Sequence, residues 1–172
     1  MKEMKIFVIL MMISHNLFSS ELNPTMLRTL YYNASQKSSD AEKFYNLLKD
    51  ATTDQPLIIG YKGMAEFMKC YHSINPVTKL SYFYRGKSDL DEAILLEPQN
   101  AELHYLRFTV QTNVPVFLNY KSRIEEDKQF LIKNMSSIKS DSELHKMICE
   151  YMMNSNYCTD SEKNFFKNAM RS

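Results

Sequence analysis

The segment from Asp91 to Arg107 is the feature of this chain that most restricts its fold. An apolar helical stripe reaches Pro98, which cannot continue a helix because its ring clashes with the preceding turn and it has no N–H to donate. Asn100 follows two residues later and is a preferred N-cap residue. A new apolar stripe then starts at Leu103. The segment predicts the end of one amphipathic helix and the start of the next, joined by the short connection that antiparallel neighbours use.

Helix start signals of the same kind recur along the chain. Asn23-Pro24 and Asn75-Pro76 each place a capping residue before a proline in the first helical position. Three other segments have the capping-box pattern, in which a hydroxyl and a Glu three residues later satisfy backbone N–H groups. These boxes begin at Ser39, Ser140 and Thr159, and Asp54 is a further candidate cap.

Between these signals the apolar residues recur with the period of a helix rather than alternating as in a strand. The chain has only 3 Gly in 172 residues, which disfavours an all-β fold with many tight turns. The β-branched residues of 109–116 are also compatible with a strand, but a single strand would have no partner. We therefore predict an all-α fold of about eight helices at residues 24–36, 39–51, 56–73, 76–96, 101–113, 120–136, 141–154 and 160–170.

The first residues have the pattern of a secretory signal peptide. Lys2 and Lys5 precede an apolar run from Ile6 to Ile13, and small residues follow at Ser19 and beyond. The run has 8 residues, whereas a helix that spans a bilayer needs about 20. We expect residues 1–19 to be a signal peptide and residues 20–172 to form a single α-helical domain that is periplasmic or secreted. The alternative is a buried N-terminal helix.

Charge and cysteine content narrow the classes of partner. Without residues 1–19 the chain has 19 basic and 19 acidic residues, which argues against nucleic acid or an anionic membrane as the main partner. No integral membrane segment is expected after cleavage. Export permits disulfides, and Cys149 and Cys158 lie close enough in sequence to pair, leaving Cys70 alone. Buried free thiols are the alternative.

Gly86, Leu90, Ala93 and Pro98 are separated by 4, 3 and 5 residues, which is similar to the second helix and the end of a tetratricopeptide repeat. In such a repeat the small residue permits a close helix crossing, the large residue fills the groove and the proline ends the unit. The resemblance implies antiparallel helix pairs stacked as a short right-handed solenoid or bundle.

Two positions depart from the repeat pattern. Gly63 lies about 11 residues earlier than the repeat period of about 34 would place it. Because about 11 residues make about three helical turns, longer helices would keep the same faces in contact. Phe108 stands where glycine is usual in the next unit. The strict peptide-binding residues of the family therefore cannot be transferred to this chain.

A wider block resembles a group of exported helical proteins from Bacteroidetes. The resemblance covers about residues 56–165 and implies an exported helical domain, with no activity attached. The segments that carry it are Gly60–Gly63, Asn75-Pro76, Lys79–Phe83, Leu103–Arg107, Asn113–Pro115 and Ile124–Lys128.

No catalytic or metal-binding motif is present in the sequence. It lacks the HExxH, GxSxG and glycine-rich loop patterns, and His72, His104 and His145 are isolated from one another. The charges of Glu125–Lys128 point in different directions on a helix, and we interpret them as a solvated face. We therefore expect no enzyme activity, no catalytic residue, no metal and no cofactor.

The first helix of each unit lines the concave face of a repeat stack, which makes the helix after Asn100 the candidate binding surface. Glu102, Tyr105 and Thr109 would share that face, and Arg107 is a residue type that anchors interfaces. These four residues are the predicted protein-binding face of an exported, non-enzymatic helical-repeat protein. Packing between helices is the alternative role for the aromatic residues.

Two other hypotheses remain open at this stage. A cavity between the long helices would bind a small apolar molecule, with adaptable methionines in its wall. An enzyme without a recognisable motif would place His72 or His104 beside a carboxylate in a cleft. The residues expected around the apolar cavity are Tyr61, Met64, Met68, Tyr82 and Phe83.

Overall fold

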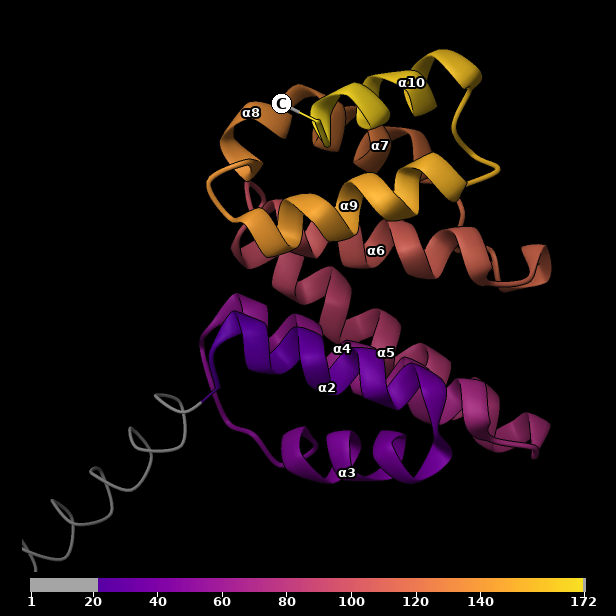
Figure 1. Ribbon diagram of the computed structural model, residues 1–172. Coiled ribbons are helices and arrows are strands. Elements are labelled where there is room, and N and C mark those ends of the chain that lie inside the picture. Colours follow the sequence, from indigo (N-terminus) through magenta and orange to yellow (C-terminus); the bar gives the residue numbers. More distant parts are fainter. Residues whose placement is uncertain (1–21, 172) are drawn as a thin grey trace, which may run out of the picture. The chain divides into compact units, whose positions relative to one another are not determined.

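The computed structural model describes residues 22–171, and every regular element in this part of the chain is helical (Figure 1). Eight α-helices have ten or more residues, which confirms the predicted all-α class and number of helices. They are α2 Pro24–Gln36, α3 Ser38–Leu48, α4 Pro56–His72, α5 Pro76–Leu96, α6 Ala101–Asn113, α7 Ile124–Lys133, α9 Ser142–Asn154 and α10 Asp160–Ala169. A four-residue helix α8, Met135–Ile138, and a 3₁₀ turn η1, Val116–Leu118, complete the set. The predicted signal peptide lies outside the described residues.

The strongest start signals act as the sequence predicts. The side-chain oxygen of Asn100 accepts hydrogen bonds from the backbone N–H groups of Glu102 and Leu103, at 3.0 and 3.2 Å. Asn75 caps α5 in the same way, and Asn23 caps α2. Thr159 forms a complete capping box with Glu162. These caps are local interactions, so the corresponding helix bounds follow directly from the sequence.

Other predicted caps are wrong. Helix α3 begins at Ser38 after Lys37, which makes no side-chain cap, so the expected box at Ser39 lies inside the helix. Asp141 rather than Ser140 caps α9, through a hydrogen bond from the Leu144 N–H. Gln55 rather than Asp54 precedes α4. In each case a neighbouring residue occupies the first non-helical position, and the sequence pattern fixes that position only to within one or two residues.

The helix expected at 120–136 is shorter and interrupted. Asn119 adopts a left-handed conformation, φ 49°, which asparagine tolerates better than most residues, and it ends η1. The helix itself starts only at Ile124, and Asn134 breaks it with φ −98° and ψ 8°. The Asn134 side chain donates to the Phe130 carbonyl at 2.8 Å, a local bond that competes with the helical pattern.

The helices gather into two compact units, the first ending at Ser88 and the second beginning at Asp89, so that α5 contributes residues to both. In unit 1, helices α2, α3 and α4 all contact one another. Tyr61 of α4 is fully buried at their centre, and the rings of Phe44 and Tyr31 meet it edge to face. Phe67 and Phe83 join α4 to the first part of α5 in the same geometry.

Helices α4 and α5 cross at a pair of glycines. A Cβ atom added to Gly86 would lie 2.8 Å from the carbonyl oxygen of Gly63 and 3.2 Å from the Cβ of Glu66. Only glycine allows the two backbones to approach this closely. The structure therefore brings together the two glycines that the repeat resemblance singled out, despite their departure from the usual spacing.

Unit 2 is organised around α6. Helix α9 lies alongside α6, and α7 and α10 pack on the same unit (Figure 1). The ring of Tyr151 on α9 meets the rings of Tyr105 and Phe108 on α6, with centroids 5.9 and 6.0 Å apart. Its hydroxyl hydrogen-bonds with Thr112 and Asn113, both at 2.7 Å. Aromatic packing and satisfied hydroxyl groups thus hold α9 against α6.

Replacing Gly86 with alanine tests the close crossing. The new methyl group meets a backbone oxygen that cannot move by a side-chain rotation, so Gly86→Ala should destabilise unit 1 by about 1–3 kcal/mol, although alanine favours a helix intrinsically. Ser88→Ala, at an exposed position of the same helix, is the matched control. Chemical denaturation measures both, and a Gly86→Ala chain as stable as the control would contradict the crossing.

Candidate functional site

The predicted binding face of α6 is inside the protein. Glu102, Tyr105, Arg107 and Thr109 have exposed fractions between 5 and 7%. Tyr105 packs on Tyr151, and the Thr109 hydroxyl donates to the Leu106 carbonyl at 2.7 Å. Every residue from Glu102 to Gln111 is buried. The expected exposure of these four side chains is therefore wrong, because α6 is covered on all sides.

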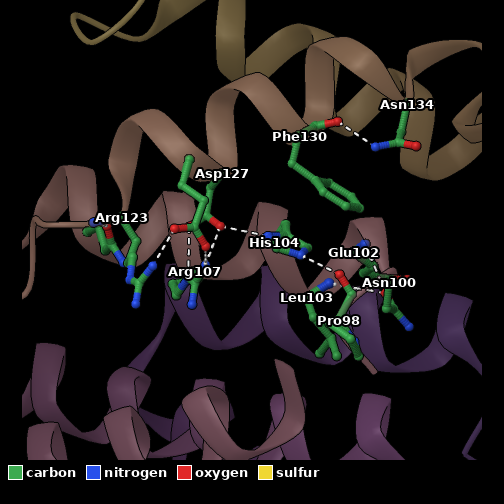
Figure 2. A network of polar contacts seen from close by, with 12 residues as sticks. Pro98, Asn100, Glu102, Leu103, His104, Arg107, Arg123, Asp127, Phe130 and Asn134 are labelled. Atoms are coloured by element: carbon green, nitrogen blue, oxygen red, sulfur yellow. Dashed lines mark hydrogen bonds and ion pairs between the residues drawn. The ribbon is translucent and has the colours of Figure 1, made fainter. Parts of the chain in front are cut away.

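One of the four, Arg107, belongs instead to a buried ionic cluster that joins α6 to α7 (Figure 2). Asp127 of α7 has no exposed surface. Arg107 donates to both of its carboxylate oxygens, from Nε to Oδ2 at 2.8 Å and from Nη2 to Oδ1 at 2.6 Å. This two-bond arrangement is the strongest that an arginine and a carboxylate form.

His104 completes the cluster. Its Nδ1 lies 2.7 Å from Asp127 Oδ1 and its Nε2 lies 3.0 Å from the Pro98 carbonyl oxygen. Both ring nitrogens of His104 therefore have a polar partner within hydrogen-bond distance. The ring of Phe130 stacks on the imidazole, with centroids 3.9 Å apart and planes 14° apart (Figure 2). The histidine is thus fixed from four directions, counting its own helix.

Local sequence explains why these groups meet. His104, Arg107 and Gln111 are spaced by 3 and 4 residues, so they share one face of α6. Asp127 lies in the first turn of α7, where a helix dipole favours negative charge. Gln111 is fully buried and accepts from the Arg123 backbone N–H at 3.2 Å. A polar stripe on α6 therefore faces the acidic start of α7.

A buried tyrosine extends the polar interior of unit 2. Tyr120 donates its hydroxyl hydrogen to Asp91 Oδ1 at 2.7 Å. Burial, and then the negative charge of Asp91, raise the pKa of Tyr120 far above its usual range. The phenol stays neutral at any physiological pH and acts as a hydrogen-bond donor, which fixes the segment before α7 to the last turns of α5.

The interpretation of Glu125–Lys128 as a solvated face is half wrong. Glu125 and Glu126 are exposed, but Asp127 and Lys128 are buried, with exposed fractions of 0 and 5%. Lys128 Nζ contacts Glu162 at 3.0 Å and donates to the Tyr157 carbonyl at 3.1 Å. Consecutive helical residues point in different directions, and here two of the four charges turn inward to bind α6 and α10.

The other histidines and the cysteines lie apart from this cluster. His72 Nε2 is 2.8 Å from the Ala34 carbonyl oxygen, and His145 Nε2 is 3.9 Å from the Cys149 sulfur. All three cysteines are free thiols, so the structure has no Cys149–Cys158 bond. Burial raises the pKa of the thiols of Cys149 and Cys158. Raised thiol pKa values disfavour the thiolate that nucleophilic chemistry needs.

The residues expected around an apolar cavity lie in unit 1. Tyr61, Met64 and Phe83 are almost completely buried in its core, whereas Met68 and Tyr82 are half-buried. Tyr82 packs edge to face on Tyr45, with ring centroids 5.7 Å apart.

Four exposed apolar side chains lie at the start of α5, one just before the helix and three within it. Ile74, Val77, Leu80 and Tyr84 have exposed fractions of 96, 77, 41 and 57%. Val77, Leu80 and Tyr84 are spaced by 3 and 4 residues, which places them on one face of α5, and Ile74 lies two residues before the helix begins. We call these four residues the α5 stripe. Sequence reasoning missed it because the same spacing is typical of a buried face.

Comparisons with known proteins add no assignment: no protein-family model, no curated protein and no solved structure matches this chain. Among residues 22–171, no helix combines the length and the apolar character needed to cross a bilayer. Within the same part of the chain, no group of three His, Cys, Asp or Glu side chains is arranged to hold a metal ion.

Removing the Asp127 carboxylate tests the role of the cluster. Asp127→Ala leaves a buried arginine and histidine without their partner, and such a loss typically costs about 3–5 kcal/mol. Glu125→Ala, at an exposed position of the same helix turn, is the control and should change stability by less than about 1 kcal/mol. Urea denaturation compares the two, and equal stabilities would show that the cluster does not hold α6 to α7.

The Lys128–Glu162 pair predicts an acid-sensitive attachment of α10. Burial alone raises the pKa of the Glu162 carboxyl, but hydrogen bonds from the Thr159 backbone and from Lys128 outweigh it, so the net pKa is lowered. The stabilisation is therefore present above the unfolded value of about 4.3 and is lost as the pH falls through the folded pKa. Glu162→Gln should flatten the acid limb of a plot of stability against pH, as should Lys128→Met. An unchanged acid limb in both variants would refute the attachment.

Proposed function

We propose that this chain is an exported, non-enzymatic helical protein that binds another protein or a peptide in the cell envelope. The α5 stripe is the contact surface in this proposal, in place of the buried residues of α6. The signal-peptide pattern of residues 1–19 supports export to the periplasm or beyond. The glycine crossing of α4 and α5 supports the tetratricopeptide-like interpretation, in which helix pairs present a binding surface.

The exposure of the α5 stripe is the observation that carries the proposal. Scattered single apolar residues on a surface need no explanation, but a continuous row marks an interaction site. Ile74 precedes the N-cap of α5, a position from which an apolar side chain often packs on the fifth residue after it. That residue is Lys79, and Ile74 remains 96% exposed. Ile74 therefore contributes little to the packing of unit 1.

The buried cluster favours a binding protein over an enzyme. A general base must reach a proton on the substrate, whereas the oxygens of Asp127 already accept from Arg107 and contact His104 within a fully buried site. These groups are satisfied by one another. Their arrangement stabilises the contact between α6 and α7, which leaves the surface of the protein to carry its function.

Site-specific photo-cross-linking tests the proposal. A benzophenone amino acid replaces Val77 in the full chain, which is expressed in its own host and irradiated in the intact envelope. The expected result is a discrete conjugate with one protein. Lys43, whose side chain is 76% exposed on α3 of the same unit, is the control position and should give no conjugate. Cross-linking only to lipid, or equally at both positions, would refute protein binding by the stripe.

A further inference from the structure

We propose that the α5 stripe binds an amphipathic helix of the partner whose apolar face is flanked by acidic residues. This inference rests on the proposed function and specifies the chemistry of the partner. It is carried by two independent features of unit 1, the linear geometry of the stripe and the charge around it.

The geometry of the stripe fits a helix. Val77, Leu80 and Tyr84 follow one another along about two turns of α5, a length of about 10 Å at about 1.5 Å per residue, and Ile74 lies just before the helix. A partner helix that places apolar residues at positions i, i+3, i+4 and i+7 covers such a row with a matching row of its own. Helices pack by setting the ridges of one into the grooves of the other. The partner segment is therefore about 10–14 residues long.

The charge around the stripe is positive. Residues 56–88 contain five basic residues, Lys62, Lys69, Lys79, Arg85 and Lys87, and one acidic residue, Glu66. Lys69 is paired with Glu42 of α3 and Arg85 with Glu66, so an excess of three positive charges remains among these residues. Glu66 is buried, with an exposed fraction of 4%. No acidic residue lies between Pro76 and Ser88 on α5. A partner with acidic flanks would meet a complementary field, which raises its association rate and excludes basic competitors.

Arg85 is held in place beside the stripe. It follows Tyr84 directly and donates from Nε and Nη2 to the two Glu66 oxygens, both at 3.1 Å. Its guanidinium also lies over the Tyr82 ring, 4.7 Å from the centroid. The side chain is nevertheless 49% exposed. A fixed, half-exposed arginine costs little conformational entropy when it meets a carboxylate of a partner.

The positive charge around the α5 stripe bears on two other possible partners, a second copy of the chain and an anionic membrane. A symmetric dimer through the stripe would place the basic flanks of two copies against each other, which like-charge repulsion opposes. An anionic membrane would also attract lysines, so its contribution must be measured directly. The acidic helix and the anionic membrane give different outcomes in the following experiment.

The test uses the full chain, labelled with ¹⁵N, and two synthetic amphipathic peptides with the same leucine row. One peptide has glutamates flanking the row and the other has lysines. Amide chemical shifts report where each peptide binds. We expect the glutamate peptide to shift the amides of residues 74–84 and to bind at least about tenfold more tightly than the lysine peptide, with the difference decreasing as salt is raised.

A double variant and a vesicle control complete the design. Ile74→Ser with Val77→Ser should abolish the shifts without changing the thermal unfolding midpoint, since the two side chains are 96 and 77% exposed. Phosphatidylglycerol–phosphatidylcholine vesicles should leave the amides of 74–84 unchanged. Four outcomes would each overturn the acidic-helix inference. They are equal binding of the two peptides, no shift of the amides of 74–84, self-association of the chain that the double variant loses, and binding to vesicles instead of the peptide.

These outcomes are distinguishable from failure of the proposed function. A protein conjugate at Val77 together with no preference for the glutamate peptide would overturn only the chemistry of the partner. The absence of any protein conjugate at Val77 would overturn the binding role itself, and the inference would fall with it.

Discussion

The carboxylate of Asp127 is the group on which unit 2 depends. It is fully removed from water and is retained by Arg107 and His104, whose positions on α6 it fixes. Moving the charged groups of an ion pair such as Asp127–Arg107 out of water costs several kcal/mol each. The net stabilisation by such a cluster is therefore small, but loss of one member leaves its partner uncompensated. The other side of His104 reaches the Pro98 carbonyl oxygen. One carboxylate thus aligns α7, α6 and the turn before α6.

Unit 1 also contains a buried carboxylate paired with an arginine, but there the arginine is partly exposed. Glu66 is buried, as Asp127 is in unit 2, but its partner Arg85 is half-exposed. The close approach of Gly63 and Gly86 sets α4 and α5 side by side, which brings Glu66 within reach of Arg85. The backbone crossing therefore positions the ion pair, and the ion pair in turn orients a cation toward the surface. In unit 2 the Arg107 side chain is buried together with Asp127, so its guanidinium faces the interior.

The sequence predicted the helices well because their starts depend on local interactions. Asn75 and Asn100 cap helices through bonds to residues two or three positions away, so nothing distant was needed. The inward turn of Asp127 was not predictable in this way, since it depends on α7 starting at Ile124 rather than at 120. A signal did exist: the 3 and 4 spacing of His104, Arg107 and Gln111 marks a polar face on a helix whose other faces are apolar. The burial of Tyr105 depends on Tyr151, which lies 46 residues further along the chain.

Apolar side chains in this chain fall into two groups that periodicity alone does not separate. Phe83 and Leu90 on α5 are buried, whereas Val77 and Tyr84 have the same helical spacing and are exposed. An exposed apolar row adds nothing to folding and increases the risk of aggregation. Charged residues would serve solubility better at these positions, and α5 has them elsewhere. In the proposed function this row is buried when the partner binds, and that is the step in which its apolar area would contribute free energy.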